Sequence, residues 1–383
     1  MNYKKIDQRL FQLIYCLTND NKIDCFVYYN NKNALLHILQ KMKIEIKNEY
    51  LFINSFFCRA TKEEIYALSK ASVVEYISSL SVACCQMNVS RDILKINDFN
   101  LLGEGISVAF IDTGINPHCD FMLGENRIKF FKDFIENKNF PYDDNGHGTF
   151  VCGVCAGNGY LSKFKYAGIA PKSNIYSLKA LNKNGEATAN KILDAMEWVF
   201  NNHKKEKIKI VCMSFGSEPI GYNDPIMQGA NALWQDGVVV VAAAGNSGPK
   251  ESTIKSPGIS PEIITVGGFD DNRFDDKTFN KDFFEMANFS SRGPALRHFK
   301  PDVVAPSVDI TSCGRSEFYT KLSGTSVATP MIAGFICLML ERFPKLSPQE
   351  VKLKLLQSCS SIGFDVNSEG YGVPNLKRIL KFS

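Results

Sequence analysis

One stretch near the C-terminal end of the sequence sets the expectations for the whole chain: Gly324-Thr325-Ser326-Val327-Ala328-Thr329-Pro330. Small residues on both sides leave the Ser326 hydroxyl uncrowded, and the ten residues 331–340 are all apolar or small. We therefore expect a buried helix that begins at about Thr325, with Ser326 in its first turn. The N–H groups of a first turn lack partners within the helix, and with the positive end of the helix dipole they favour an oxyanion beside the serine.

A membrane span is the alternative for this segment, because residues 322–340 carry no charge. Only the second half of the segment is strongly apolar, however, and no basic loop flanks it. The pattern favours a helix in a protein core, and we predict no membrane span.

A nucleophilic serine needs a base and a group that orients this base. Among the five histidines of the chain, only His147 lies in a stretch of similarly small residues, at positions 144–149. Upstream, an apolar run that begins at Val108 predicts a buried strand ending in Asp112. A carboxylate at the C-terminal end of a parallel strand lies on the edge where α/β proteins bind ligands. The sequence therefore offers an acid, a base and a nucleophile in the chain order Asp112, His147, Ser326.

This order, with the residues around it, resembles the subtilisin family of serine proteases, the subtilases. The resemblance covers the chain from about Ile106 to its C-terminus. It implies an α/β fold, a doubly wound and mostly parallel sheet with helices on both faces. The matching stretches are Asp112-Thr113-Gly114, His147-Gly148-Thr149, Met213-Ser214-Phe215-Gly216, Ala242-Ala243-Ala244-Gly245-Asn246-Ser247-Gly248 and Gly324 to Pro330.

The resemblance implies a serine endopeptidase that cleaves protein or peptide substrates through an acyl-enzyme intermediate. Ser326 would be the nucleophile, His147 the base and Asp112 the orienting acid. The amide of Asn246 would stabilise the oxyanion, although a turn residue between two glycines is the alternative interpretation. The walls of the substrate cleft would come from Ser214, Phe215, Gly216, Ala244 and Gly245.

Lys255 lies in a segment, 251–258, that resembles the family segment beneath the S1 pocket, where a small residue often stands at the position of the lysine. An ammonium group at the pocket floor would favour Asp or Glu as the P1 residue of the substrate. The alternative is that Lys255 extends into solvent and leaves an ordinary apolar pocket. Residues 82–86, where we expect self-cleavage, contain no acid, and this favours the alternative.

The first part of the chain predicts a separate α+β domain, which we place at residues 1–86, before a catalytic domain at 87–383. Its order is βαββαβ, the split βαβ motif. A capping box at Thr61–Glu64 opens its second helix. The unit resembles the family's inhibitory propeptide, so we expect a self-processed zymogen with its own propeptide as intramolecular inhibitor; an unrelated small domain is the alternative. The expected strands are 23–29, 44–47, 50–58 and 73–82, and the expected helices are 34–42 and 61–72.

In the second part, strands and helices alternate, as a parallel sheet with crossover connections requires. A capping box with proline at the first helical position predicts a further helix that begins after Ser347. We expect strands at 174–181, 208–215, 237–244, 263–266 and 302–305, and helices at 187–203 and 224–235.

Composition excludes several other classes of protein. The net charge of +4 is small, and no basic cluster recurs with aromatic residues, so we expect no nucleic-acid partner. The twelve cysteines are scattered, and nothing near Cys152 and Cys155 completes a zinc set, which favours packed, reduced thiols. Residues 1–18 resemble an amphipathic helix more than a signal peptide. We therefore expect a cytoplasmic location, with export lacking a recognisable signal as the alternative.

No cofactor is expected, and calcium is not expected at the family's usual loop site, with other calcium sites left open. The best-known calcium site of the family uses a loop within the His helix, and the corresponding stretch here is 156–171. This stretch contains Lys163 and Lys165 and no carboxylate, which is a poor ligand set for a hard cation.

Two functions of other classes remain open at this point. The fold could serve a binding or regulatory protein without turnover, or it could hydrolyse lipids or small esters. The complete set of Asp112, His147, Ser326 and Asn246 counts against the first. The order of the triad and the absence of a Gly-x-Ser-x-Gly elbow count against the second.

Overall fold

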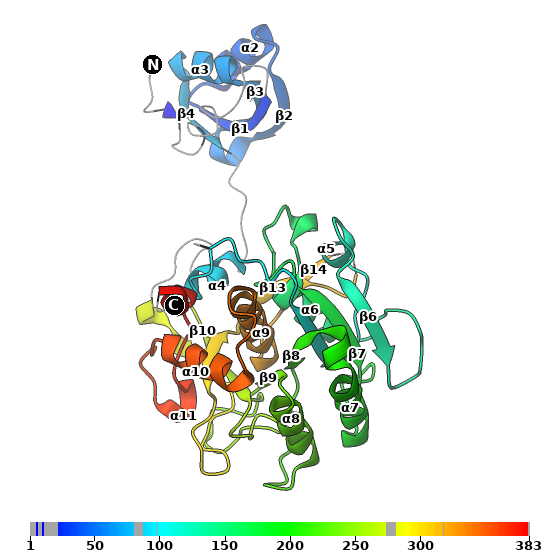
Figure 1. Ribbon diagram of the computed structural model, residues 1–383. Coiled ribbons are helices and arrows are strands. Elements are labelled where there is room, and N and C mark those ends of the chain that lie inside the picture. The colour runs from blue at the N-terminus through cyan, green and yellow to red at the C-terminus, as the bar shows by residue number, and fades with distance from the viewer. Residues whose placement is uncertain are drawn as a thin grey trace. The chain divides into compact units, whose positions relative to one another are not determined.

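The computed structural model describes residues 5, 6, 10, 22–79, 87–97, 99–272, 281–316 and 318–381. The chain divides into two compact units, Met1–Ala83 and Cys84–Ser383 (Figure 1). Most of the predicted N-terminal amphipathic helix and the expected self-cleavage stretch lie outside the described residues.

The N-terminal unit is a four-stranded antiparallel sheet with the strand order β2-β3-β1-β4. Its element order is the predicted βαββαβ, and both bonds of the capping box between Thr61 and Glu64 are present. A small core of its own, with Val27, Leu35 and Ile65 fully buried, holds the helices against the sheet. The elements are β1 (Lys22–Tyr29), α2 (Lys32–Lys41), β2 (Glu45–Tyr50), β3 (Ser55–Thr61), α3 (Lys62–Lys70) and β4 (Val74–Ser79).

One predicted strand in this unit, 50–58, is wrong in its first half. Leu51–Ile53 forms a short 3₁₀ helix, and Asn54 follows in the left-handed conformation with φ of 48°. The antiparallel pairing of β2 with β3 requires the chain to reverse here. Asn tolerates the left-handed region that such a tight turn uses. The apolar side chains of Leu51 and Ile53, which suggested a strand, are exposed.

The second unit is built on a large sheet with the order β11-β10-β9-β8-β5-β7-β6, and β12 pairs with β10 beside this path. All pairs are parallel except that of β10 with β11. From β5 the chain builds β6 and β7 on one side and then β8, β9 and β10 on the other, so the topological switch point lies between β5 and β8. The strands are β5 (Ser107–Asp112), β6 (Ile128–Asp133), β7 (Asn174–Lys179), β8 (Ile208–Met213), β9 (Val239–Ala243), β10 (Ile264–Asp270), β11 (Glu285–Met286), β12 (Val303–Pro306), β13 (Ile310–Cys313) and β14 (Tyr319–Leu322).

Helices cover both faces of this sheet, which confirms the predicted doubly wound α/β fold (Figure 1). Helices α6 and α9 pack against each other, and α7 and α8 form a second pair. As predicted, α9 begins at Thr325, and residues 327–340 are all buried between α6 and the strands β8, β9 and β10. The helices are α4 (Met87–Ile93), α5 (Cys119–Met122), α6 (His147–Ala156), α7 (Ala189–Glu206), α8 (Pro225–Gln235), α9 (Thr325–Arg342), α10 (Pro348–Ser358), α11 (Val366–Glu369) and α12 (Leu376–Lys381).

Within the described residues, no helix is long and apolar enough to cross a membrane, so α9 is a core helix. The capping box at Ser347 and Glu350 opens α10 as predicted. The strand β6 and the hairpin of β13 and β14 were not predicted. In β6, lysines at positions 129 and 132 interrupt the apolar pattern, because this strand lies at the edge of the sheet and is only partly buried.

Candidate active site

The acid and the base meet at the carboxyl edge of the sheet, next to the topological switch point. Asp112 is the last residue of β5 and is 2% exposed, while His147 is the first residue of α6. The Nδ1 of His147 donates to Oδ1 of Asp112 at 2.8 Å, and the Thr113 amide donates to the same oxygen at 2.7 Å. With Nδ1 as the donor, the Nε2 of His147 is left as the nitrogen that can accept a proton.

A second buried carboxylate, Asp143, organises the turn that carries His147. Its Oδ1 accepts hydrogen bonds from the Thr113 hydroxyl and from the amides of Asn145 and Gly146 at 2.7 to 3.1 Å. Its Oδ2 accepts from the amide and the hydroxyl of Thr149 at 2.8 and 2.7 Å. The carboxylate therefore joins the end of β5 to the residues on both sides of the base. Sequence reasoning missed this residue, although its place four positions before His147 was a signal.

Two glycines allow the first turn of α6 to approach the end of β5. A Cβ on Gly148 would lie 2.2 Å from the carbonyl oxygen of Gly114, and Gly114 itself has φ of 121°. The Gly148 amide donates to the Thr113 hydroxyl at 2.8 Å. A side chain at position 148 would push His147 away from Asp112.

The surroundings of His147 shift its pKa in two directions. Burial lowers it, but the charge of Asp112 and the hydrogen bond to this carboxylate, with a smaller contribution from Asp143, raise the pKa above its usual value of 6.5. The net shift is upward, so the protonated imidazolium is stabilised where it is formed. The side chain is 26% exposed, so solvent and substrate can reach it.

Ser326 and Asn246 converge on a space that Gly324 leaves open. Asn246 follows β9, and its Oδ1 accepts from the Thr325 amide at 2.9 Å and from the Thr325 hydroxyl at 3.0 Å. Its Nδ2 donors therefore remain for another acceptor. A methyl group built on Gly324 would lie 3.1 Å from Ser326 Oγ and 3.2 Å from Asn246 Nδ2. A small acceptor atom beside the serine hydroxyl can therefore reach the asparagine amide.

The other predicted site residues lie at the same edge of the sheet, because β5, β8 and β9 are parallel neighbours that end there. Ser214 follows β8 and is buried, Phe215 packs partly on the core, and Gly216 is exposed. Ala244 and Gly245 follow β9 and are buried directly before Asn246.

Lys255 lies between these two segments. Its amide donates to the Ala244 carbonyl at 2.9 Å, and its side chain packs against Gly216 and Gly245. Its ammonium forms an ion pair with Glu218, and the lysine side chain is 16% exposed. Lys255 therefore lies beside the segments 214–216 and 244–245, and its partner Glu218 is a residue that the sequence did not suggest.

The described cysteines are all free, and burial raises the pKa of Cys152 and Cys155 well above the usual value of 9.0. One group of potential metal ligands, His118, Asp120 and Cys313, occurs in the described part of the chain. Two of its possible ligand atoms already accept hydrogen bonds. His118 Nδ1 accepts the Asp120 amide at 3.1 Å, and Asp120 Oδ2 accepts the Tyr319 hydroxyl at 2.7 Å. Burial also raises the pKa of the Cys313 thiol, which disfavours the thiolate that a metal needs.

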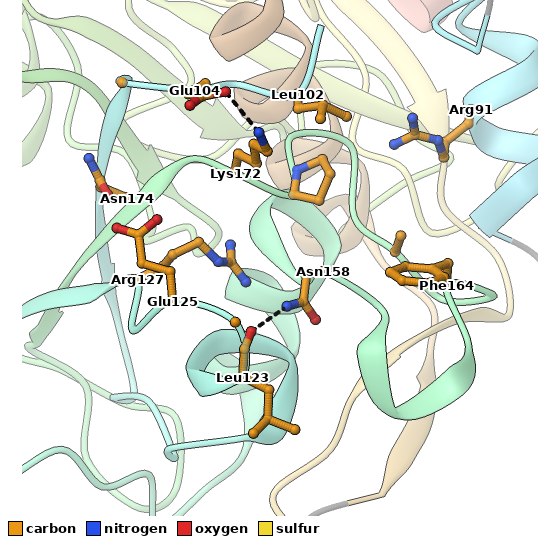
Figure 2. A pocket seen from close by; sticks show the side chains of 14 residues that line it. Arg91, Leu102, Glu104, Leu123, Glu125, Arg127, Asn158, Phe164, Lys172 and Asn174 are labelled. Atoms are coloured by element: carbon orange, nitrogen blue, oxygen red, sulfur yellow. Dashed lines mark hydrogen bonds and ion pairs between the residues drawn. The ribbon is translucent and has the colours of Figure 1, made fainter. Parts of the chain in front are cut away.

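The loop within 156–171, where no calcium site is expected, forms hydrogen bonds with α5 and the residue after it. Asp120 Oδ1 accepts the Leu161 amide at 3.0 Å, and the Asn158 amide group donates to the Leu123 carbonyl at 3.0 Å. Beside this loop lies a cavity of about 770 Å³, lined in part by Phe164 and by the ion pair of Lys172 with Glu104 (Figure 2). None of the predicted site residues lines it, so this cavity is separate from the candidate active site.

Replacing Asp112 by Asn should lower the pKa of His147. The charge that raises this pKa is removed, whereas the burial that lowers it remains. Titration of the imidazole Cε1–H signal by NMR measures the shift, and His203, which pairs with Asp236, serves as the unaffected control. An unchanged His147 pKa in Asp112→Asn would show that the carboxylate does not control the base.

With this geometry established, the chain can be compared with known proteins. The sequence pattern described as "Subtilase family" matches residues 103–373. Serine protease AprX of Bacillus subtilis (strain 168) is 36% identical over 366 residues, which span 88% of this chain and 80% of that protein. Subtilisin DY of Bacillus licheniformis is 33% identical over 290 residues, 74% of this chain and 93% of that protein.

Among solved structures, sphericase superposes with a TM-score of 0.65 at 28% identity, covering 75% of this chain and 97% of that one. The family match spans more than half of the chain, and it contains every predicted site residue from Asp112 to Ser326. The chain therefore belongs to the subtilase family and is a subtilisin-like serine endopeptidase.

Proposed function

We propose that the protein hydrolyses peptide bonds through a triad of Asp112, His147 and Ser326 and an acyl-enzyme intermediate. The observation that carries this proposal is the 2.8 Å hydrogen bond between His147 and Asp112, and Ser326 lies in the first turn of α9. Protein or peptide is the substrate.

In this mechanism His147 Nε2 takes the proton of the Ser326 hydroxyl as Oγ attacks the peptide carbonyl, and it then gives the proton to the leaving amine. The carbonyl oxygen becomes an oxyanion beside Asn246 Nδ2 and the Ser326 amide. The loss of one such donor costs on the order of 3 kcal/mol. A water molecule, deprotonated by His147, then attacks the acyl-enzyme ester, and Ser326 Oγ leaves with the proton that His147 returns.

The substrate would bind as an extended chain beside the segments Ser214–Gly216 and Ala244–Gly245. The exposed backbone at Gly216 can pair with a peptide in the manner of an added strand, whereas the backbone groups of Ala244 and Gly245 already form hydrogen bonds within the protein. Lys255, which lies between the two segments, would form the floor of the pocket for the P1 side chain.

Two alternatives of other classes predict different behaviour. A binding protein without turnover would not react with a serine-directed fluorophosphonate, and an esterase aimed at lipids would react without digesting casein. Labelling at Ser326 together with casein digestion supports the proposed endopeptidase. Labelling without casein digestion would favour the esterase, and the absence of both reactions would favour the binding protein.

Replacing Ser326 by Ala should reduce casein hydrolysis by about a million-fold, because the triad acts as a unit with one nucleophile. The same variant should remain unprocessed at its N-terminus. Thr329→Ser, a hydroxyl variant one turn further along α9, is the control for packing of the helix. Casein cleavage by Ser326→Ala at the normal rate would refute the proposed nucleophile.

We further propose that the N-terminal unit is an autoinhibitory propeptide that the enzyme removes itself. The unit is compact, has its own core, and precedes the catalytic unit in the chain. Inhibition would arise if the chain that leaves its last strand occupied the substrate cleft.

N-terminal sequencing of the active protein should find a start near residues 84–87. Full-length Ser326→Ala should keep its original N-terminus, and addition of active enzyme should test whether cleavage also occurs between molecules. An active form that begins before Val73 would refute the propeptide, since β4 would then remain attached.

We propose that catalysis needs no cofactor and that no calcium binds in the 156–171 loop. The Asp120 carboxylate already accepts hydrogen bonds from Leu161 and Tyr319, which fills the role that a cation would have there. Removal of divalent ions with a chelator should therefore leave the activity and the thermal midpoint of unfolding unchanged. A drop of several degrees that added calcium reverses would contradict this.

The cellular compartment belongs to the same set of proposals. The free, mostly buried thiols among the described residues suit a reducing interior, which favours the cytoplasm. Export is the alternative, and recovery of the active enzyme from the culture medium would establish it.

A further inference from the structure

Lys255 is fixed in position by its backbone and by two glycines. A Cβ on Gly216 would lie 2.5 Å from Lys255 Cβ, and one on Gly245 would lie 2.4 Å from Lys255 Cγ, distances that real Cβ atoms do not adopt. The next residue, Ser256, exchanges two backbone hydrogen bonds with Ser217 at 2.9 and 3.0 Å. The aliphatic stem of the lysine therefore fills the space that the two glycines leave between the cleft walls.

This space lies directly beside the proposed oxyanion donor, because Gly245 precedes Asn246 in the chain. The side chain of the residue that supplies the scissile carbonyl must extend close to this donor. The stem of Lys255 consequently occupies room that a large P1 side chain would need. This step rests on the proposed function of Ser326 and Asn246.

The two partners of the Lys255–Glu218 ion pair are held very differently. The lysine side chain is 16% exposed and packed along its stem, whereas the glutamate side chain is 84% exposed. An exposed carboxylate gains little from such a pair and can rotate into water at small cost. The Lys255 ammonium cannot move into water with the carboxylate, because the aliphatic part of the lysine side chain is enclosed. When Glu218 moves away, the ammonium therefore needs another anion as a partner.

We propose that Glu218 is a displaceable counter-ion, and that a substrate with Asp or Glu at P1 replaces it on Lys255. The exchange substitutes one charge-assisted hydrogen bond for another and keeps the ammonium partnered. A large apolar P1 side chain offers no such replacement and meets the lysine stem. A basic P1 side chain meets a like charge at the pocket floor. The substrate class of this site is therefore peptides with an acidic P1 residue.

The test uses peptides that differ only in P1, with Ala, Glu, Phe or Lys, and kcat/KM relative to the Ala peptide for each enzyme. Wild type should prefer Glu over Phe and Lys. Glu218→Gln should raise the Glu/Ala ratio by up to about fivefold, the factor that an exposed ion pair can supply, mainly through a lower KM. Added salt should reduce the ratio in both enzymes.

Two lysine variants separate charge from volume. Lys255→Met keeps a stem of similar length without the ammonium, so it should lose the Glu preference by about tenfold or more and still discriminate against Phe. Lys255→Gly should admit Phe. Because each value is a ratio to the Ala peptide within one variant, a general loss of active enzyme does not change it.

The outcomes distinguish this inference from the proposed function. If wild type neither cleaves the Ala peptide nor reacts with a fluorophosphonate at Ser326, the proposed function fails and the inference fails with it. If the Ala peptide is cleaved but Phe is preferred over Glu, or Glu218→Gln and Lys255→Met leave the Glu/Ala ratio unchanged, only the inference is overturned.

Discussion

A single buried carboxylate, that of Asp143, holds the parts of the site together. Burial of a charge is costly unless hydrogen bonds satisfy it, and here three amides and two hydroxyls do so. The donors come from the residue after Asp112 and from residues on both sides of His147. The network therefore fixes the end of β5 against the start of α6, and with it the contact between acid and base.

The nucleophile is positioned by a comparable device on the other side of the sheet edge. Asn246 follows β9 and accepts two hydrogen bonds from Thr325, which joins this strand to the first turn of α9. The hydrogen-bonding capacity of its oxygen is thereby used within the protein, and the nitrogen is aimed at the space left by Gly324. Helix α9 is buried over almost its whole length, and this burial fixes the position of Ser326 relative to the sheet.

Much of this arrangement could be predicted from the sequence, because its signals are local. The apolar run up to Asp112, the small residues around Ser326 and the capping boxes at Thr61 and Ser347 each report on their own neighbourhood. The edge strand β6 could not be predicted, since a half-exposed strand carries lysines that break its pattern.

Several contacts that hold the site residues in place could not be predicted from local sequence signals, because they join residues that are far apart in the chain. The ion pair of Lys255 with Glu218 spans 37 positions, and Asp143 meets Thr113 across 30. The sequence around Glu218 does not indicate Lys255, and the closeness of Asp143 to His147 in the chain does not indicate Thr113. Lys255 could be placed by resemblance, but its counter-ion required the folded chain.

The most direct test of this account is kinetic analysis of Asp143→Asn. The new amide nitrogen would lose the hydrogen bond from the Thr149 amide and would have to donate to the Thr149 hydroxyl, while the new amide oxygen keeps the other three bonds. We predict that kcat falls on the order of a hundredfold through misplacement of His147, with little change in KM. Asp194→Asn, at an exposed position on α7, is the matched control. Unchanged kcat in Asp143→Asn, with the protein folded, would contradict the claim that this carboxylate positions the base.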